Sequence, residues 1–149
     1  MGEGLAAGVR TNGEGVPLKL VLLVDDSRFV RMATEKVLSR AGYSVVTASD
    51  GEEALRIASS RIPDLILLDM LLPRLGGVEV LQALRKSPLT ASIPVVVLSS
   101  LPQKNEAKLL TEGATAYFEK SKMELDQNSE SLIQIVKRTL ELVKGGQPA

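Results

Sequence analysis

The sequence has 149 residues, of which 44% are hydrophobic and 24% are charged. A chain of this length and composition can bury one core, so we expect a single folded domain rather than global disorder. Lys plus Arg number 18 and Asp plus Glu number 18, and this balance disfavours direct binding to nucleic acid or to an anionic membrane surface. Neither Cys nor His occurs, which excludes disulfides, thiolate or imidazole catalysis and zinc sites built from those ligands.

Segments that target or anchor a chain are not apparent. The longest apolar runs lie at residues 20–24, 65–68 and 95–98, and they fall far short of the roughly 20 residues that a membrane helix needs. We therefore expect a cytoplasmic protein without membrane insertion. Residues 1–17 are rich in glycine and lack periodicity, which predicts a flexible N-terminal tail.

Strand and helix patterns alternate after the tail. Short, nearly continuous apolar runs predict strands at residues 19–24, 45–48, 65–68, 94–98 and 115–118. Apolar residues at helical spacing predict helices at residues 29–41, 50–60, 78–86, 103–112 and 132–143. Asp50 with Glu53 is typical of a helix start, and Gly42 and Gly113 are typical of helix ends.

Five strands that alternate with helices predict an α/β fold with a parallel sheet covered on both faces. In such sheets, ligands bind beyond the carboxyl ends of the strands, where the strand order reverses. Polar side chains follow four of the predicted strands: Asp25 and Asp26, Asp69, Ser99 and Ser100, and Lys120. Each of these residues is also common in solvated loops, but their joint placement favours a functional site.

Three carboxylates at one sheet edge repel one another and raise one another's pKa values. A hard divalent cation relieves this repulsion, and Mg²⁺ fits best because it needs only one or two protein carboxylates beside water and phosphate oxygens. An aspartate in such a site can attack phosphorus and form an acyl phosphate. The Lys120 ammonium and the Ser99 hydroxyl would then bind the phosphoryl oxygens.

The sequence resembles the receiver domain of bacterial two-component response regulators. The stretches that carry the resemblance are LVLLVDDS at 20–27, ASDGEEAL at 48–55, PDLILLDMLLP at 63–73, PVVVLSS at 94–100 and GATAYFEK at 113–120. The likeness covers about residues 18–144, which we take as the receiver domain, with 145–149 as a loose end. It implies a flavodoxin-like, doubly wound (βα)5 fold with five parallel strands in the order 2-1-3-4-5.

The resemblance also implies the role of each site residue. Asp69 is the expected phosphoacceptor and Lys120 the expected phosphate-binding lysine. Mg²⁺ is expected to bind Asp26, Asp69 and the backbone carbonyl of Leu71, with Asp25 acting through water. Ser99 corresponds to the switch hydroxyl and Tyr117 to the switch aromatic residue.

Partners follow from the same resemblance. Because the sequence has no His, the phosphoryl group is expected to come from a sensor histidine kinase or a histidine phosphotransfer protein. Phosphorylation is expected to change the face built from the helix at 103–112, the fifth strand and the last helix. A downstream protein would bind that face, and the domain would be a monomer or a phosphorylation-linked dimer.

Some positions depart from the family pattern. Ser121 follows Lys120 where Pro is usual, so a cis peptide there would lack the residue that makes it inexpensive. Gly76–Gly77 replaces a frequent Asp-Gly, and Ser100 replaces a common Ala.

Leu71 and Leu101 occupy positions that flank the path of a hydrolytic water and are often polar in relatives. We expect them to shield the phosphoryl group and to slow self-dephosphorylation, unless both side chains pack clear of that path.

Two other function classes remain open at this stage. A haloacid-dehalogenase-type phosphatase also uses a strand-end aspartate, but it needs a general-acid Asp two positions later, where this chain has Leu71. A receiver-like interaction module that works without phosphorylation would not require the full set of polar residues. We therefore expect a phosphorylatable receiver that is not a conventional enzyme.

Overall fold

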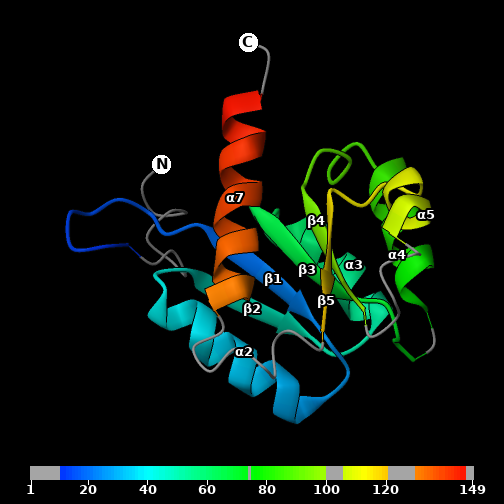
Figure 1. Ribbon diagram of the computed structural model, residues 1–149, viewed down its shortest axis with the longest axis horizontal. Coiled ribbons are helices and arrows are strands. Elements are labelled where there is room, and N and C mark those ends of the chain that lie inside the picture. Colours follow the sequence, from blue (N-terminus) through cyan, green and yellow to red (C-terminus); the bar gives the residue numbers. More distant parts are fainter. Residues whose placement is uncertain (1–10, 74, 100–105, 121–129, 147–149) are drawn as a thin grey trace.

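The computed structural model of the chain describes residues 11–73, 75–99, 106–120 and 130–146 (Figure 1). Five strands form one sheet with the order β2-β1-β3-β4-β5, and every pair of neighbours is parallel. The strands are β1 Leu20–Val24, β2 Ser44–Ala48, β3 Leu65–Asp69, β4 Val95–Ser99 and β5 Ala116–Glu119. The predicted α/β fold and strand order are confirmed.

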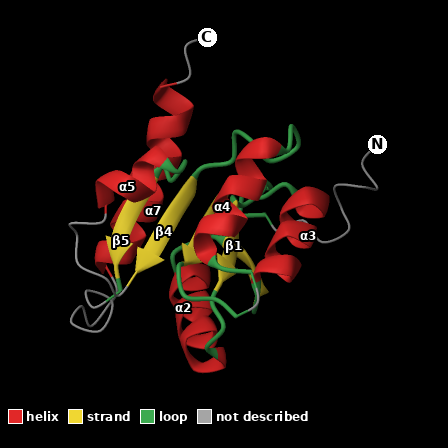
Figure 2. Cartoon of the chain, turned by 90° about the vertical axis from the view of Figure 1, so that its right-hand side faces the viewer, coloured by secondary structure: helices red, strands yellow, loops and turns green. Residues whose placement is uncertain are grey.

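Helices cover both faces of this sheet (Figures 1 and 2). They are α2 Arg28–Arg40, α3 Gly51–Arg61, α4 Gly77–Lys86, α5 Glu106–Thr111 and α7 Glu130–Gly146. Helices α2 and α7 pack on one face, and α3, α4 and α5 pack on the other. Helix α7 continues into the segment that the sequence predicted to be loose, and the predicted start of α5 at 103–105 lies outside the described residues. Among the described helices, none combines the length and the apolar composition that a bilayer span requires.

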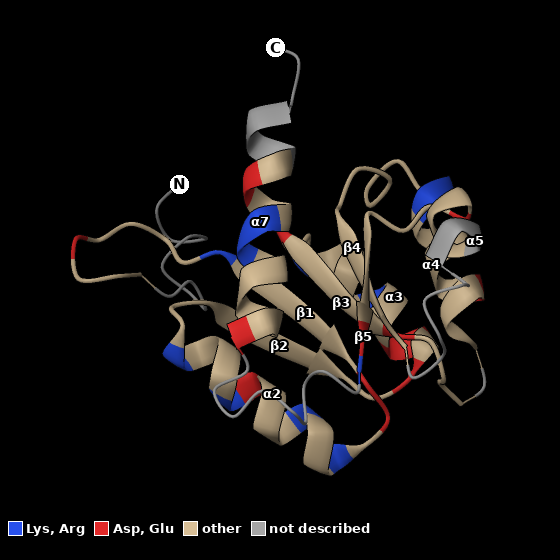
Figure 3. Cartoon of the chain, viewed as in Figure 1, with Lys and Arg blue, Asp and Glu red and all other residues tan. Residues whose placement is uncertain are grey.

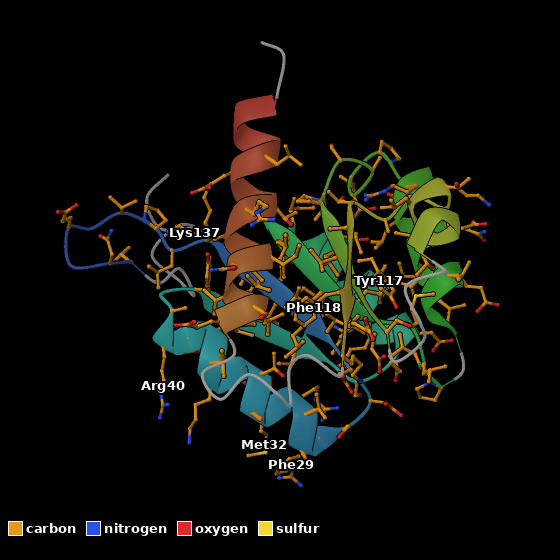
Figure 4. All side chains as sticks on the ribbon, viewed as in Figure 1. Phe29, Met32, Arg40, Tyr117, Phe118 and Lys137 are labelled. Atoms are coloured by element: carbon orange, nitrogen blue, oxygen red, sulfur yellow. The ribbon has the colours of Figure 1, made fainter. Side chains whose placement is uncertain are left out.

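The sheet is buried from both sides. Leu22 and Val24 pack toward α3 and α4, whereas Val21 and Leu23 pack toward α2 and α7. This double burial explains why the strands read as continuous apolar runs instead of alternating patterns. On β5 the two aromatic rings separate in the same way, with Tyr117 in the α3–α4–α5 cluster and Phe118 in the α2–α7 cluster (Figure 4).

Side-chain caps fix where two helices begin, next to the carboxyl edge of the sheet. The Ser27 hydroxyl accepts a hydrogen bond from the Val30 amide at 3.2 Å, which starts α2 directly after β1. The Asp50 carboxylate accepts from the Glu53 amide at 2.8 Å, which starts α3 after β2. These caps satisfy amides that have no partner within the helix, and the predicted Asp50–Glu53 start is confirmed.

The apolar residues of α2 do not all face the sheet. Phe29 belongs to the helical spacing from which that helix was predicted, yet its side chain is 82% exposed, and Met32 is 59% exposed. Both lie on the outer side of α2, away from the sheet (Figure 4). The buried residues of α2 are instead Thr34 and Leu38.

Candidate functional site

Three carboxylates meet at the carboxyl edge of the sheet. Asp25 and Asp26 directly follow β1, and Asp69 is the last residue of β3. The strands are parallel neighbours with Val24 opposite Leu68, so Asp25 and Asp69 leave them side by side. One carboxylate oxygen of each of the three residues lies within 4.8 Å of the others. Figure 3 shows acidic residues gathered along this edge.

Lys120 reaches these carboxylates from the far side of β4. Its Nζ atom lies 3.1 Å from Asp25 Oδ2 and 3.5 Å from Asp69 Oδ2. The Lys120 amide donates to the Ser99 carbonyl at 2.8 Å, which places the lysine just beyond the ends of β4 and β5. Because β4 lies between β3 and β5, a long side chain is needed to span the gap, and lysine has one.

Backbone groups orient the buried carboxylates. Asp25 Oδ1 accepts from the Ser27 amide at 2.9 Å, and Asp69 Oδ1 accepts from the Leu71 amide at 3.3 Å. The Arg31 guanidinium donates to the Asp25 carbonyl at 2.8 Å and ties α2 to the end of β1. Sequence reasoning missed Arg31. The sequence shows a basic residue one turn inside the helix that follows the acidic pair, but it does not reveal the partner of that residue.

The pocket shifts the pKa of Asp69. Burial of its side chain, followed by the charge of Asp25, raises the pKa of Asp69 above its ordinary value. The Lys120 ammonium and the hydrogen bond from the Leu71 amide act in the opposite direction but do not cancel the rise. A carboxylate that burial and a like charge both destabilise gains from a cation that neutralises its charge.

The pKa of Lys120 is shifted as well. Burial by itself would lower the pKa of Lys120, but its hydrogen bond to Asp25 and the negative charges of Asp69 and Asp25 raise the pKa overall. The ammonium therefore stays protonated at neutral pH. It is a permanent positive charge beside Asp69.

The donor set fits a hard divalent cation. Three carboxylates face one ammonium, so a divalent cation would balance the remaining negative charge. Asp25 and Asp69 are buried while Asp26 is exposed, which leaves one side of the cluster open to water. Mg²⁺ prefers this arrangement, because it binds a few carboxylate oxygens and keeps several waters.

The other predicted site residues lie nearby or outside the described residues. Ser99 is 2% exposed at the end of β4, one position after Leu98, which pairs in register with Asp69. Tyr117 is 8% exposed and packs in the cluster on the α3–α4–α5 face. The Leu71 side chain is 65% exposed. Three residues that the sequence singled out fall outside the described part of the chain: Ser100, Leu101 and Ser121.

The family of the chain follows from a match to a family model. The model of the response regulator receiver domain matches residues 21–136, which include the whole pocket and all five strands except the first residue of β1. The chain belongs to the response regulator receiver family.

Individual relatives agree with this assignment. The alkaline phosphatase synthesis transcriptional regulatory protein PhoP of Bacillus subtilis is 42% identical over 103 residues, which cover 68% of this chain and 42% of PhoP. The chemotaxis response regulator CheY4 of Vibrio cholerae matches with a TM-score of 0.74 and 31% identity, over 82% of this chain and 98% of CheY4. A response regulator from Desulfuromonas acetoxidans matches with a TM-score of 0.72 and 31% identity, over 83% of this chain and 98% of that one.

The receiver fold and the pocket together define the class of function. The chain is a phosphoacceptor receiver of two-component signal transduction, with an acidic pocket of Asp25, Asp26 and Asp69 beside Lys120. A receiver of this family is not a conventional enzyme, and this family membership decides against the haloacid-dehalogenase alternative. Membership of this family implies a histidine kinase as the kind of phosphodonor.

The raised pKa of Asp69 predicts how stability depends on pH without metal. The folded protein binds a proton at Asp69 more readily than the unfolded chain does, so this carboxyl group lowers stability as the pH rises from 3.8 through its raised pKa. In metal-free buffer at pH 7, we expect Asp69→Asn to raise the free energy of unfolding by on the order of 1 kcal/mol. Urea unfolding at several pH values measures this gain, which should shrink as the pH falls.

Lys120→Met is a control that should lower the free energy of unfolding instead of raising it. Removing the ammonium leaves two buried carboxylates without their shared cation, so stability at pH 7 should fall by about 2 kcal/mol. The loss should be smaller than for a fully buried pair, because the Lys120 side chain is 22% exposed. A gain for Asp69→Asn that does not change with pH would contradict the assigned cause.

Proposed function

We propose that Asp69 is the phosphoacceptor of this receiver. The observation that carries the proposal is the position of its carboxylate: at the end of β3, 3.5 Å from Lys120 Nζ and within 4.8 Å of carboxylate oxygens of Asp25 and Asp26. An Asp69 oxygen forms a bond to phosphorus while the bond from phosphorus to the donor nitrogen breaks, and that nitrogen keeps the electron pair. Lys120 binds a phosphoryl oxygen and neutralises charge that the transfer brings into the pocket.

The pocket would hold Mg²⁺ through its own oxygens. Asp26, Asp69 and the Leu71 carbonyl are the proposed ligands, and Asp25 acts through water. The bound ion supplies charge neutralisation for the attacking carboxylate and the transferred group. The Leu71 amide, which donates to Asp69 Oδ1 at 3.3 Å, keeps the carboxylate and this loop in one fixed arrangement.

The donor is proposed to be a sensor histidine kinase or a histidine phosphotransfer protein. These 149 residues contain no His, so the phosphohistidine that donates the group lies outside them. The proposed setting is the cytoplasm, where such donors work.

The first test is phosphorylation itself. Incubation with Mg²⁺ and a small acyl-phosphate donor should add one phosphoryl group, as measured by intact-mass spectrometry. Asp69→Asn should abolish the addition, because it removes the nucleophile, and chelation of Mg²⁺ should abolish it in the wild type. Asp64→Asn is the matched control, because Asp64 lies at the opposite end of the sheet from the pocket. Its carboxylate accepts a hydrogen bond from the Leu20 amide.

Two outcomes would overturn the assignment. Phosphorylation that persists in Asp69→Asn would place the acceptor elsewhere. A wild-type protein that takes no phosphoryl group from any donor would favour a receiver that works by phosphorylation-independent binding.

We also propose that Ser99 and Tyr117 form the switch. A phosphoryl group brings about −1.5 to −2 charge and three strong acceptor oxygens, to which the buried Ser99 hydroxyl can donate. Tyr117 shares a buried cluster with Leu109 of α5. Since the ring is already buried, its response would be a rearrangement inside that cluster rather than entry from solvent.

The proposed readout is the face formed by α5, β5 and α7. A shift of Tyr117 would change the packing of the buried cluster that includes Leu109 and thereby bias α5 between two positions. A downstream protein, or a second copy of the receiver in a phosphorylation-linked dimer, would bind the phosphorylated arrangement.

NMR on the phosphorylated protein tests this switch. In the wild type, amide chemical shifts should change at Tyr117 and Leu109 as well as around Asp69. Ser99→Ala should still accept the phosphoryl group, but its shift changes should be confined to the pocket because the hydroxyl that follows the phosphoryl group is missing. Identical changes at Tyr117 in both proteins would contradict the role of Ser99.

The last proposal concerns the lifetime of the acyl phosphate. Leu71 is 65% exposed beside the pocket and offers no group that could orient a hydrolytic water, and Leu101 is proposed to act with it. We expect slow self-dephosphorylation. Leu71→Asn and Leu101→Glu should each shorten the phosphoryl lifetime several-fold, on the order of 1 kcal/mol in barrier height, and the double variant should shorten it further. The decay of the phosphorylated mass over time measures this effect, and unchanged decay in all three variants would show that the leucines do not control the water.

A further inference from the structure

The end of β3, which carries the proposed phosphoacceptor, lies close to the start of α4. Gly77 is the first residue of α4, and its amide donates to the Met70 carbonyl at 3.2 Å. A Cβ atom built on Gly77 would lie 2.7 Å from Met70 Cα, 2.9 Å from Met70 Sδ and 3.0 Å from the Asp69 carbonyl oxygen. Two of these three atoms belong to the backbone, which cannot move aside as a flexible side chain can. Even an alanine at this position would therefore push against Asp69 and Met70.

A second glycine also makes a close approach, to Leu75 and to α4. Gly51 is the first residue of α3. A Cβ atom built on it would lie 2.6 Å from the Leu75 carbonyl oxygen, 2.8 Å from Leu75 Cβ and 2.7 Å from Val80 Cγ2. The start of α3 thus packs directly on Leu75 and on α4. Neither glycine has a positive φ angle, so the reason for glycine at both positions is space rather than backbone conformation.

The residues between these two contacts belong to the site. Asp69 and Met70 touch Gly77, Leu75 touches Gly51, and Leu71 lies between the two contact points in sequence. The Leu71 amide also holds Asp69 Oδ1 at 3.3 Å. We propose that Gly51 and Gly77 are positioning residues of the phosphorylation site, which set where the Asp69 carboxylate and the Leu71 carbonyl lie. This inference rests on the proposed roles of Asp69 and Leu71.

Gly76 offers a matched control one residue away. A Cβ atom built on Gly76 would meet only the Glu79 Oε1 atom, at 2.9 Å. That atom is the end of a flexible carboxylate that accepts a hydrogen bond from the Gly76 amide, so it can move aside. Alanine is also a better helix former than glycine, so the substitutions at Gly51 and Gly77 should not weaken α3 or α4 by themselves.

The experiment measures phosphorylation rate against Mg²⁺ concentration for wild type, Gly77→Ala, Gly51→Ala and Gly76→Ala. Intact mass follows phosphorylation by a small acyl phosphate, and thermal unfolding shows that each variant is folded at the assay temperature. We expect Gly77→Ala to raise the Mg²⁺ concentration for half-maximal rate about tenfold or more, as for other residues that orient metal ligands. Gly51→Ala should change it in the same direction, and Gly76→Ala should leave it within about twofold of wild type.

A purely structural role would lower the unfolding temperature without changing the Mg²⁺ dependence of the folded variants. That result, in either Gly77→Ala or Gly51→Ala, overturns the proposal, and so does an equal effect of Gly76→Ala. If Gly77→Ala does not fold, Gly51→Ala alone decides.

A metal-free NMR measurement separates this inference from the proposed function. The Leu71 amide should shift in Gly77→Ala and Gly51→Ala but stay near its wild-type position in Gly76→Ala. If wild type is not phosphorylated, the proposed function fails, while the Leu71 amide still shows whether the glycines position the loop. An unmoved Leu71 amide in both Gly77→Ala and Gly51→Ala refutes the positioning role.

Discussion

Two buried carboxylates on neighbouring strands share one ammonium, and the rest of the site depends on this arrangement. Asp25 is completely buried and Asp69 is 3% exposed, so each is separated from the water that would otherwise stabilise its charge. Lys120 approaches both, at 3.1 Å and 3.5 Å, yet the pKa of Asp69 remains raised. The pocket therefore keeps an excess of negative charge, because its carboxylates outnumber its one ammonium group. A structure optimised only for stability would replace these groups with apolar residues.

The sheet order makes this arrangement possible. Neighbouring parallel strands deliver Asp25 and Asp69 to the same edge, and β4 separates them from β5. The lysine must cross that strand, and in crossing it passes the end of β4, where Ser99 lies. The chemical centre and the strand that leads to the α5–β5–α7 face are thus linked by the geometry of the sheet itself. Tyr117 belongs to the same buried cluster as Leu109 of α5, which continues this link to a helix.

Much of this could be predicted from the sequence, because the relevant signals are local. Apolar runs predicted the strands. The position of Asp25, Asp69 and Lys120 directly after the strands predicted that they belong to the site. Contacts between helices and strands cannot be predicted from such local patterns. The exposure of Phe29 depends on how α2 rotates against the sheet, which its helical spacing alone did not decide. The hydrogen bond from Arg31 to the Asp25 carbonyl and the left-handed Ile62 at the end of α3 likewise depend on tertiary packing.

Gly76 and Gly77 also show that local sequence does not reveal tertiary contacts. In the sequence, Gly76 and Gly77 are neighbours, and both were predicted to lie before the helix at 78–86. In three dimensions they differ, because only Gly77 faces the backbone of Asp69 and Met70. In the proposed role of Asp69, a carboxylate that meets a cation and a phosphoryl group needs its backbone fixed to within a fraction of an ångström. Close backbone packing supplies that precision without adding another charge to a pocket in which every further charge would shift the pKa of Asp69.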